Sequence, residues 1–214
     1  MQTFSKLLGA RAAATGLAAL GCSVLAMSSE AIAEPGEQEE PASRDAPDHL
    51  AGLPEPSGEI WVHAPGVGAE AHVELFDEDG DFDDEALAEL DEVFECRRSG
   101  DSRAVHPQLL ILLSHVYDHF GGERIELVSG FRNQQNEGSR HFHASAMDLR
   151  VGDASVREIA EFAEELDTDE GPNLGIGRYP RSGFVHIDIR APGEPSYRWV
   201  QIGNRHRQLQ IPDS

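Results

Sequence analysis

The chain has few cysteines and few basic side chains. It contains 2 cysteines in 214 residues, and 17 lysines and arginines stand against 39 aspartates and glutamates. The formal net charge of -22 excludes a partner held through its phosphate backbone, which requires basic patches, so we expect no nucleic acid to bind. No repeat with a period of about 20–50 residues occurs, which excludes solenoids and blade arrays. The 39% of apolar residues is adequate for one core, so we expect a single, monomeric folded unit.

Cysteine is too scarce for a disulfide framework. Cys22 falls in an N-terminal segment that we expect to be removed, which leaves Cys96 without a partner in the mature chain. Cys96 lies in a segment with helical spacing, and no histidine follows at a distance that suggests a catalytic pair. We therefore expect a half-buried structural thiol.

Apolar runs are too short for a membrane span, which needs about 20 residues. Residues 1–33 instead have the features of an export signal, because basic residues precede an apolar run over 12–27 and an Ala-Ile-Ala sequence ends at Ala33. We expect cleavage after Ala33 and a periplasmic or secreted protein. An uncleaved anchor and a lipid attached at Cys22 are the alternatives.

The rest of the chain divides into a linker and a domain. Residues 34–57 are rich in Pro, Glu, Asp and Ala, which predicts an acidic disordered linker, and residues 58–214 form the expected domain. Apolar periodicity predicts both strands and helices in this domain. The expected strands cover 60–62, 72–76, 124–129, 146–151 and 184–189, with one more near 199–202, and the expected helices begin near Asp83, Pro107 and Val156.

Four residues stand apart as candidates for chemistry. His141 and Asp148 are seven residues apart across a loop that enters an expected strand. His186 and Asp188 occupy alternate positions of another strand and so point to one face. A catalytic zinc takes three protein ligands and leaves a fourth place for water, and two histidines with one aspartate meet that requirement. The same spacing also suits a histidine paired with an aspartate in a core.

The residues around these positions favour the metal. SRHFHASAMD (139–148) resembles the Ser-x-His-x-x-Gly-x-Ala-x-Asp signature of the D-alanyl-D-alanine metallopeptidases, a superfamily that includes the hedgehog signalling domain. VSGFR (128–132) is similar to the Ser-Gly-Tyr-Arg strand end of the same group. GIGRYP (175–180) and GFVHID (183–188) resemble its YcbK-type murein endopeptidase branch.

This resemblance covers roughly 73–189 and implies a fold and a set of roles. The fold is α+β, with a small antiparallel sheet that carries a zinc site and packs against two or three helices. Arg132 matches a residue that grips a substrate carboxylate, and Ser139 matches a position that supports the loop or the bound peptide. The implied zinc ligands are His141, Asp148 and His186.

Two residues depart from the family pattern. Ala144 replaces a glycine, which puts the local backbone in question because alanine tolerates positive φ poorly. Gly183 stands where relatives carry a glutamate that acts as general base. Asp188 is then a candidate base, or else a carboxylate that orients His186. In a swapped arrangement Asp188 binds the metal and His186 is the acid or base, and His143 is a further candidate.

The resemblance implies a zinc peptidase that hydrolyses peptidoglycan cross-links or stem peptides, as endopeptidase or carboxypeptidase. Bound zinc lowers the pKa of its water toward about 7 and polarises the scissile carbonyl, while Asp188 or His186 accepts the proton. The alternative is a catalytically inactive, zinc-containing binding module of hedgehog-like fold. The absence of the glutamate at Gly183 motivates that alternative.

Overall fold

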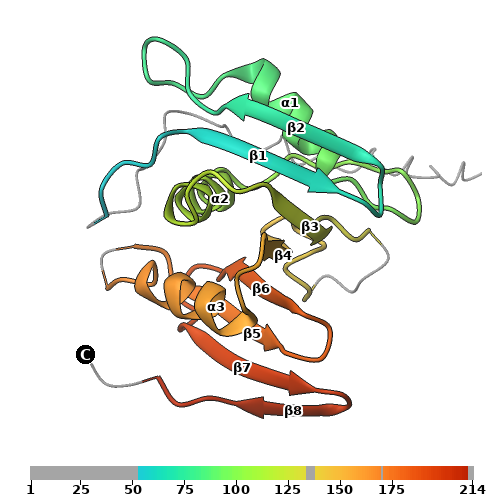
Figure 1. Ribbon diagram of the computed structural model, residues 1–214, viewed down its shortest axis with the longest axis vertical. Helices are drawn as coiled ribbons and strands as arrows, with labels where there is room; N and C mark the ends of the chain where they lie inside the picture. The colour runs from blue at the N-terminus through green and yellow to red at the C-terminus, as the bar shows by residue number, and fades with distance from the viewer. Residues whose placement is uncertain (1–52, 134–137, 170, 212–214) are drawn as a thin grey trace, which may run out of the picture. The chain divides into compact units, whose positions relative to one another are not determined.

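The computed structural model describes residues 53–133, 138–169 and 171–211 (Figure 1). The expected signal peptide at 1–33, with Cys22, and most of the expected linker lie outside the described residues. In the part of the linker that is described, Ser57 donates a hydrogen bond from Oγ to Oδ1 of Asp118 at 2.6 Å. Within the described ranges, no helix combines the length and apolar character needed to cross a bilayer.

Eight strands and three helices make up the described part of the chain. The strands are β1 (Glu59–Ala64), β2 (Ala69–Glu74), β3 (Ile125–Ser129), β4 (Ala146–Val151), β5 (Leu174–Tyr179), β6 (Phe184–Ile189), β7 (Tyr197–Ile202) and β8 (Arg205–Gln208). The helices are α1 (Asp84–Val93), α2 (Pro107–His119) and α3 (Val156–Glu165).

The strands form one mixed sheet in the order β2-β1-β3-β4-β6-β5-β7-β8. The pairs β1–β3 and β5–β7 are parallel and the other neighbours are antiparallel. The fold class α+β is therefore confirmed, but a small antiparallel sheet is wrong. The sequence predicted too few strands, because β5 contains two glycines and β8 is exposed along its whole length. Neither strand therefore shows an alternation of apolar and polar residues.

The helix boundaries follow local sequence rules. Asp83 caps α1 by accepting the N–H of Ala86, and Pro107 occupies the first turn of α2. Ser155 and Glu158 form a capping box at the start of α3. Leu109 to Tyr117 are buried all around α2, so this helix runs through the core rather than along the surface.

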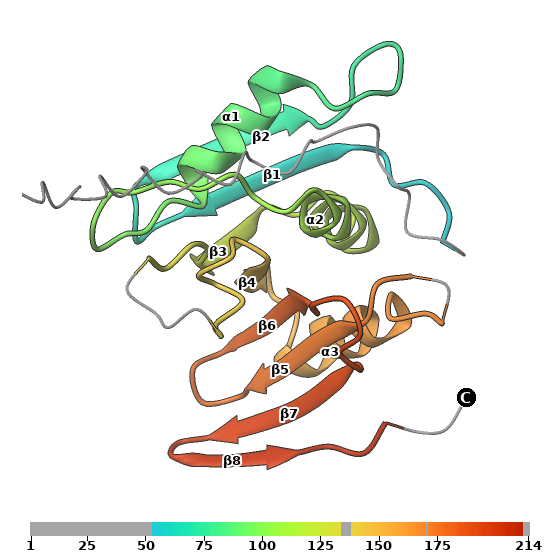
Figure 2. The ribbon, with the colours of Figure 1, turned by 180° about the vertical axis from the view of Figure 1, so that it is seen from behind.

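The sheet has different surroundings on its two faces from β4 to β7. Alternate residues of β5 and β7 turn toward α3, where Arg178 pairs with Glu164 at 2.7 Å and Arg198 pairs with Asp167. The view from behind shows no described helix over the opposite face of β5, β7 and β8 (Figure 2). The candidate site lies on this opposite face.

Candidate metal centre

Three buried side chains converge where β4 and β6 pair. Asp148 in β4 is the register partner of His186 in β6, and His141 joins them from the loop that precedes β4. The exposed fractions of these residues are 4% for His141, 3% for Asp148 and 8% for His186. One ligand atom of each lies within 4.8 Å of the others, so the group could hold a metal ion.

Oδ1 of Asp148 is the point at which the three side chains meet. It lies 2.8 Å from Nδ1 of His186 and 3.4 Å from Nε2 of His141. A tetrahedral zinc ion with bonds of about 2.0–2.1 Å separates neighbouring ligand atoms by roughly 3.3 Å. The 3.4 Å distance is close to this value, and the 2.8 Å distance is a hydrogen bond that would have to lengthen by about 0.5 Å around an ion. The donor set is one that zinc prefers, so the residues fit a zinc ion after this small adjustment.

The backbone near the end of β3 fixes the ring of His141. Nδ1 of His141 lies 2.7 Å from the carbonyl oxygen of Gly130, so Nδ1 carries the proton and donates, while Nε2 faces Asp148 with its lone pair. Gly130 must be a glycine, because a Cβ there would lie 2.7 Å from the carbonyl oxygen of Phe94. Burial lowers the pKa of His141, which favours the neutral ring that a metal requires.

Asp188 holds His186 from the other side of the ring. Nε2 of His186 lies 3.0 Å from Oδ2 of Asp188, and Oδ1 of Asp188 accepts from Nη1 of Arg190 at 3.2 Å. Burial opposes a charge on His186, but hydrogen bonds with Asp148 and then Asp188 outweigh it and raise the pKa of the imidazole to about 9. Both ring nitrogens are therefore engaged by carboxylates, and a metal ion bound at Nδ1 would have to replace the proton on that nitrogen.

Two glycines of β5 make room for this arrangement. A Cβ on Gly175 would lie 2.0 Å from Oδ2 of Asp188, and a Cβ on Gly177 would lie 2.3 Å from the ring of Trp199. The Trp199 ring in turn lies 5.1 Å from the ring of His186, between centroids. The two glycines of the GIGRYP segment are therefore required, because Asp188 of β6 and Trp199 of β7 fill the space that their side chains would occupy.

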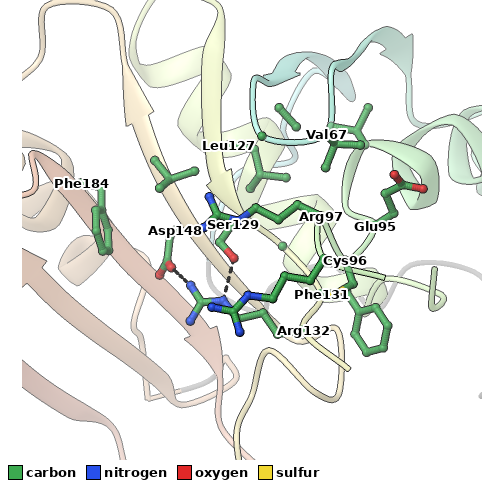
Figure 3. A pocket seen from close by; sticks show the side chains of 16 residues that line it. Val67, Glu95, Cys96, Arg97, Leu127, Ser129, Phe131, Arg132, Asp148 and Phe184 are labelled. Carbon is green, nitrogen blue, oxygen red and sulfur yellow. Dashed lines mark hydrogen bonds and ion pairs between the residues drawn. The ribbon is translucent and has the colours of Figure 1, made fainter. Parts of the chain in front are cut away.

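Arg132 is tied to the same carboxylate. Its Nε donates to Oγ of Ser129 at 2.7 Å, and its Nη2 donates to Oδ2 of Asp148 (Figure 3). Burial raises the pKa of Asp148, but the imidazoles of His141 and His186 outweigh this effect and hold the pKa well below its usual range. The carboxylate is therefore ionised and ready to bind a cation.

A cavity of about 340 Å³ opens beside Asp148. Its walls come from the turn after β1, the segment after α1, the end of β3, and Phe184 at the start of β6 (Figure 3). Val67, Leu127 and Phe131 supply apolar wall, and arginines supply charge. A bound molecule in this cavity can reach the carboxylate side of the candidate metal centre.

The other residues singled out from the sequence lie around the centre. Ser139 is half-buried, and its carbonyl accepts the N–H of Phe142 at 3.0 Å in the loop before β4. His143 is exposed on that loop. Ala144 has φ 50°, the only positive value at a non-glycine among the described residues, which is a backbone conformation that favours glycine. Gly183 lies in the turn between β5 and β6 and brings no carboxylate to the site.

Cys96 is more buried than the sequence suggested. It is 3% exposed, lines the cavity, and lies 3.5 Å from Oδ1 of Asn133 through its sulfur.

Sequence reasoning missed several contacts that shape the site. The carbonyl of Gly130, the pairing of Arg132 with Asp148 and the ring of Trp199 against His186 all arise from strand pairing between distant segments. The SGFR segment did signal a strand end, but not that its arginine would bind Asp148.

Comparison with known proteins agrees with this geometry. The family model described as peptidoglycan L,D-endopeptidase MepK matches residues 66–193. A curated relative of that name from Escherichia coli strain K12 is 29% identical in an alignment 135 residues long, which covers 57% of this chain and 71% of the relative. A probable peptidoglycan L,D-endopeptidase MepK from Haemophilus influenzae is 26% identical over 116 residues, 48% of this chain and 60% of that protein. No solved structure gives a significant match.

Proposed function

The chain belongs to the family described as peptidoglycan L,D-endopeptidase MepK, within the D-alanyl-D-alanine metallopeptidase and hedgehog-like superfamily, and we propose that it is a zinc-dependent peptidase that hydrolyses peptide bonds of peptidoglycan. The names of the relatives favour an L,D-endopeptidase over a D,D-endopeptidase or a carboxypeptidase. The observation that carries the proposal is the buried group of two imidazoles and one carboxylate beside an open cavity.

His141, Asp148 and His186 would hold the ion. Bound zinc supplies a water of lowered pKa and polarises the scissile carbonyl. The chain prepares these ligands before any ion arrives, because Gly130 fixes the tautomer of His141 and Arg132 fixes the orientation of Asp148. Such supporting contacts raise metal affinity in other zinc proteins.

Asp188 acts through His186. Its carboxylate binds Nε2, which is the ring nitrogen opposite to the Nδ1 that meets Asp148. This position supports Asp188 as the residue that orients His186 rather than as the general base. It also supports His186 rather than Asp188 as the third ligand. Asp188 is 2% exposed, so a substrate has little access to it.

The location and organisation of the protein follow from the same proposal. We propose that residues 1–33 direct export, that 34–57 act as a linker, and that 58–214 form the catalytic unit. Export places the enzyme beside its polymer in the periplasm or outside the cell. Peptidoglycan peptides are then its partners, and we expect it to act as a monomer.

A catalytically inactive binding module is the second candidate. The absence of a carboxylate at Gly183 favours it, because relatives that carry a glutamate at this position use it as general base, and this chain has a glycine there. An inactive module would still bind zinc and peptidoglycan, so metal content does not separate the two candidates. Only turnover does.

The decisive experiment is digestion of purified sacculi and defined muropeptides with zinc-loaded protein, analysed by mass spectrometry. A chelated sample is the control. We expect new amine and carboxyl ends at one type of bond, with L,D linkages cut, and loss of these products after chelation. Zinc-loaded, folded protein that binds muropeptides without forming products would favour the inactive module.

A further inference from the structure

The cavity beside Asp148 concentrates positive charge in an acidic protein. Its lining residues of acidic or basic type are Glu95, Arg97, Arg98, Arg132 and Asp148, three cations against two anions. The whole chain carries a formal net charge of -22. A basic cavity in such a chain can attract an anionic ligand that the rest of the surface repels.

One edge of the Arg132 guanidinium, formed by Nε and Nη2, is bound within the protein. Its Nε donates to Ser129 and its Nη2 donates to Asp148, so the edge formed by these two nitrogens is occupied. That edge is one of those with which a guanidinium grips a carboxylate through two parallel bonds. This edge of Arg132 is therefore bound to Ser129 and Asp148, and a second cation would add to the binding of a substrate carboxylate.

Arg97 is placed to be that cation. Its side chain and that of Arg132 both extend into the cavity, toward the side on which Asp148 lies (Figure 3). The aliphatic stem runs beside the turn after β1, where a Cβ on Gly66 would lie 3.3 Å from Cδ of Arg97. Within the described residues, no hydrogen bond or ion pair engages the guanidinium of Arg97.

Other arginines of the chain contrast with Arg97. Arg140 pairs with Glu194 at 2.7 Å, and Arg150 and Arg178 also bind glutamates. An arginine that lines a cavity and lacks a carboxylate partner offers its full set of donors to a ligand.

We infer that Arg97 is a specificity-determining residue that binds a free carboxylate of the substrate, while Arg132 positions Asp148. The inference rests on the proposed function and narrows its substrate class. The apolar wall of Leu127, Phe131 and Phe184 suits an aliphatic side chain next to that carboxylate. A stem peptide whose diamino acid carries a free carboxylate has this chemistry, whereas its amidated form lacks the charge.

The test compares two cross-linked stem peptides that differ only in whether the diamino-acid carboxylate is free or amidated. We expect the wild-type protein to prefer the free acid by about 10- to 100-fold in kcat/KM, the range of a charged hydrogen-bonded contact. Arg97→Gln should lose this preference through a higher KM on the free acid, with kcat and the amidated substrate little affected. Arg157→Gln is the matched control, because Arg157 is exposed on α3.

Two results would overturn the inference. One is an Arg97→Gln protein that keeps the wild-type preference, and the other is an equal loss on both substrates. If the wild-type protein cleaves neither substrate, the proposed function fails, but the inference is still testable by calorimetry with the two product peptides. Tighter binding of the free acid that Arg97→Gln abolishes would support it, and equal binding of both products to the wild-type protein would overturn it.

Discussion

The imidazole of His186 lies between two carboxylates, with Oδ2 of Asp188 at 3.0 Å from its Nε2 and Oδ1 of Asp148 at 2.8 Å from its Nδ1. Only one of these nitrogens can face a metal ion shared with His141, since His141 contacts Asp148 and not Asp188. The arrangement therefore favours our proposal that Asp148 is a ligand together with His141 and His186, and that Asp188 orients the ring of His186.

Asp188→Asn and Asp188→Ala test this division of roles. Both proteins should still bind zinc at about one ion per chain, with affinity about 10- to 100-fold weaker, because a carboxylate that orients a ligating histidine contributes that much. The peptidase rate should fall as well. Zinc affinity is measured by competition with a chromophoric chelator. A complete loss of zinc in Asp188→Ala would instead show that Asp188 is a ligand, as in the swapped arrangement.

Replacement of a proposed ligand should have a larger effect. His141→Ala and Asp148→Ala each remove one of three protein ligands, so zinc content should fall from about one ion per chain to near zero, together with activity. Elemental analysis of protein purified without chelator gives the content. His143→Ala is the control for zinc content, because His143 is exposed on the same loop. Normal zinc in His141→Ala would rule out the proposed ligand set.

Gly175 should be intolerant of a side chain for one specific reason. A Cβ there would overlap Oδ2 of Asp188, so Gly175→Ala should destabilise the protein by about 1–3 kcal/mol and displace Asp188 from His186. The cost should be smaller in the Asp188→Ala background, where the overlapping atoms are gone. Urea unfolding of the four proteins of this double-mutant cycle measures the coupling. Additive costs would show that Asp188 is not the obstacle.

The elements that the sequence predicted are those with a local signal. Alternating or helical apolar patterns and caps such as Asp83 and Ser155 placed the helices and the strands that carry Asp148 and His186. Strand β5 was missed because its glycines have low strand preference, and their reason lies in Asp188 and Trp199 on other strands.

The candidate site likewise contains residues that the sequence predicted and residues that it did not. The spacing of His141 and Asp148 and the strand position of His186 allowed convergence, the family resemblance of the surrounding residues favoured it, and the three do converge. The partner of Arg132 was not predictable, because the bond to Asp148 depends on the pairing of β3 with β4 and on the turn of the chain at Gly130. Arg97 had no signal at all, since the cavity forms between segments far apart in the chain.

His106 precedes α2, at a position where another residue should stabilise the protein. It occupies the N-cap without a side-chain cap bond, and its Nδ1 is buried with no hydrogen-bond partner among the described residues. His106→Ser should supply an oxygen for the N–H groups of the first turn and stabilise the protein by about 1 kcal/mol at pH 8. His106→Ala removes the imidazole without adding a cap, so it serves as the comparison.

The gain should increase as the pH falls. Burial lowers the pKa of His106 in the folded protein below the ordinary value of 6.5, so the unfolded chain binds a proton first as the solution is acidified. This penalty is absent well above pH 6.5 and grows as the pH drops through that value. Both variants escape it, and only the serine variant gains the cap. Urea unfolding at pH 8 and pH 5.5 in the presence of chelator should therefore show a pH-dependent difference from wild type for both variants. A difference that does not change with pH would mean that His106 titrates normally in the folded protein.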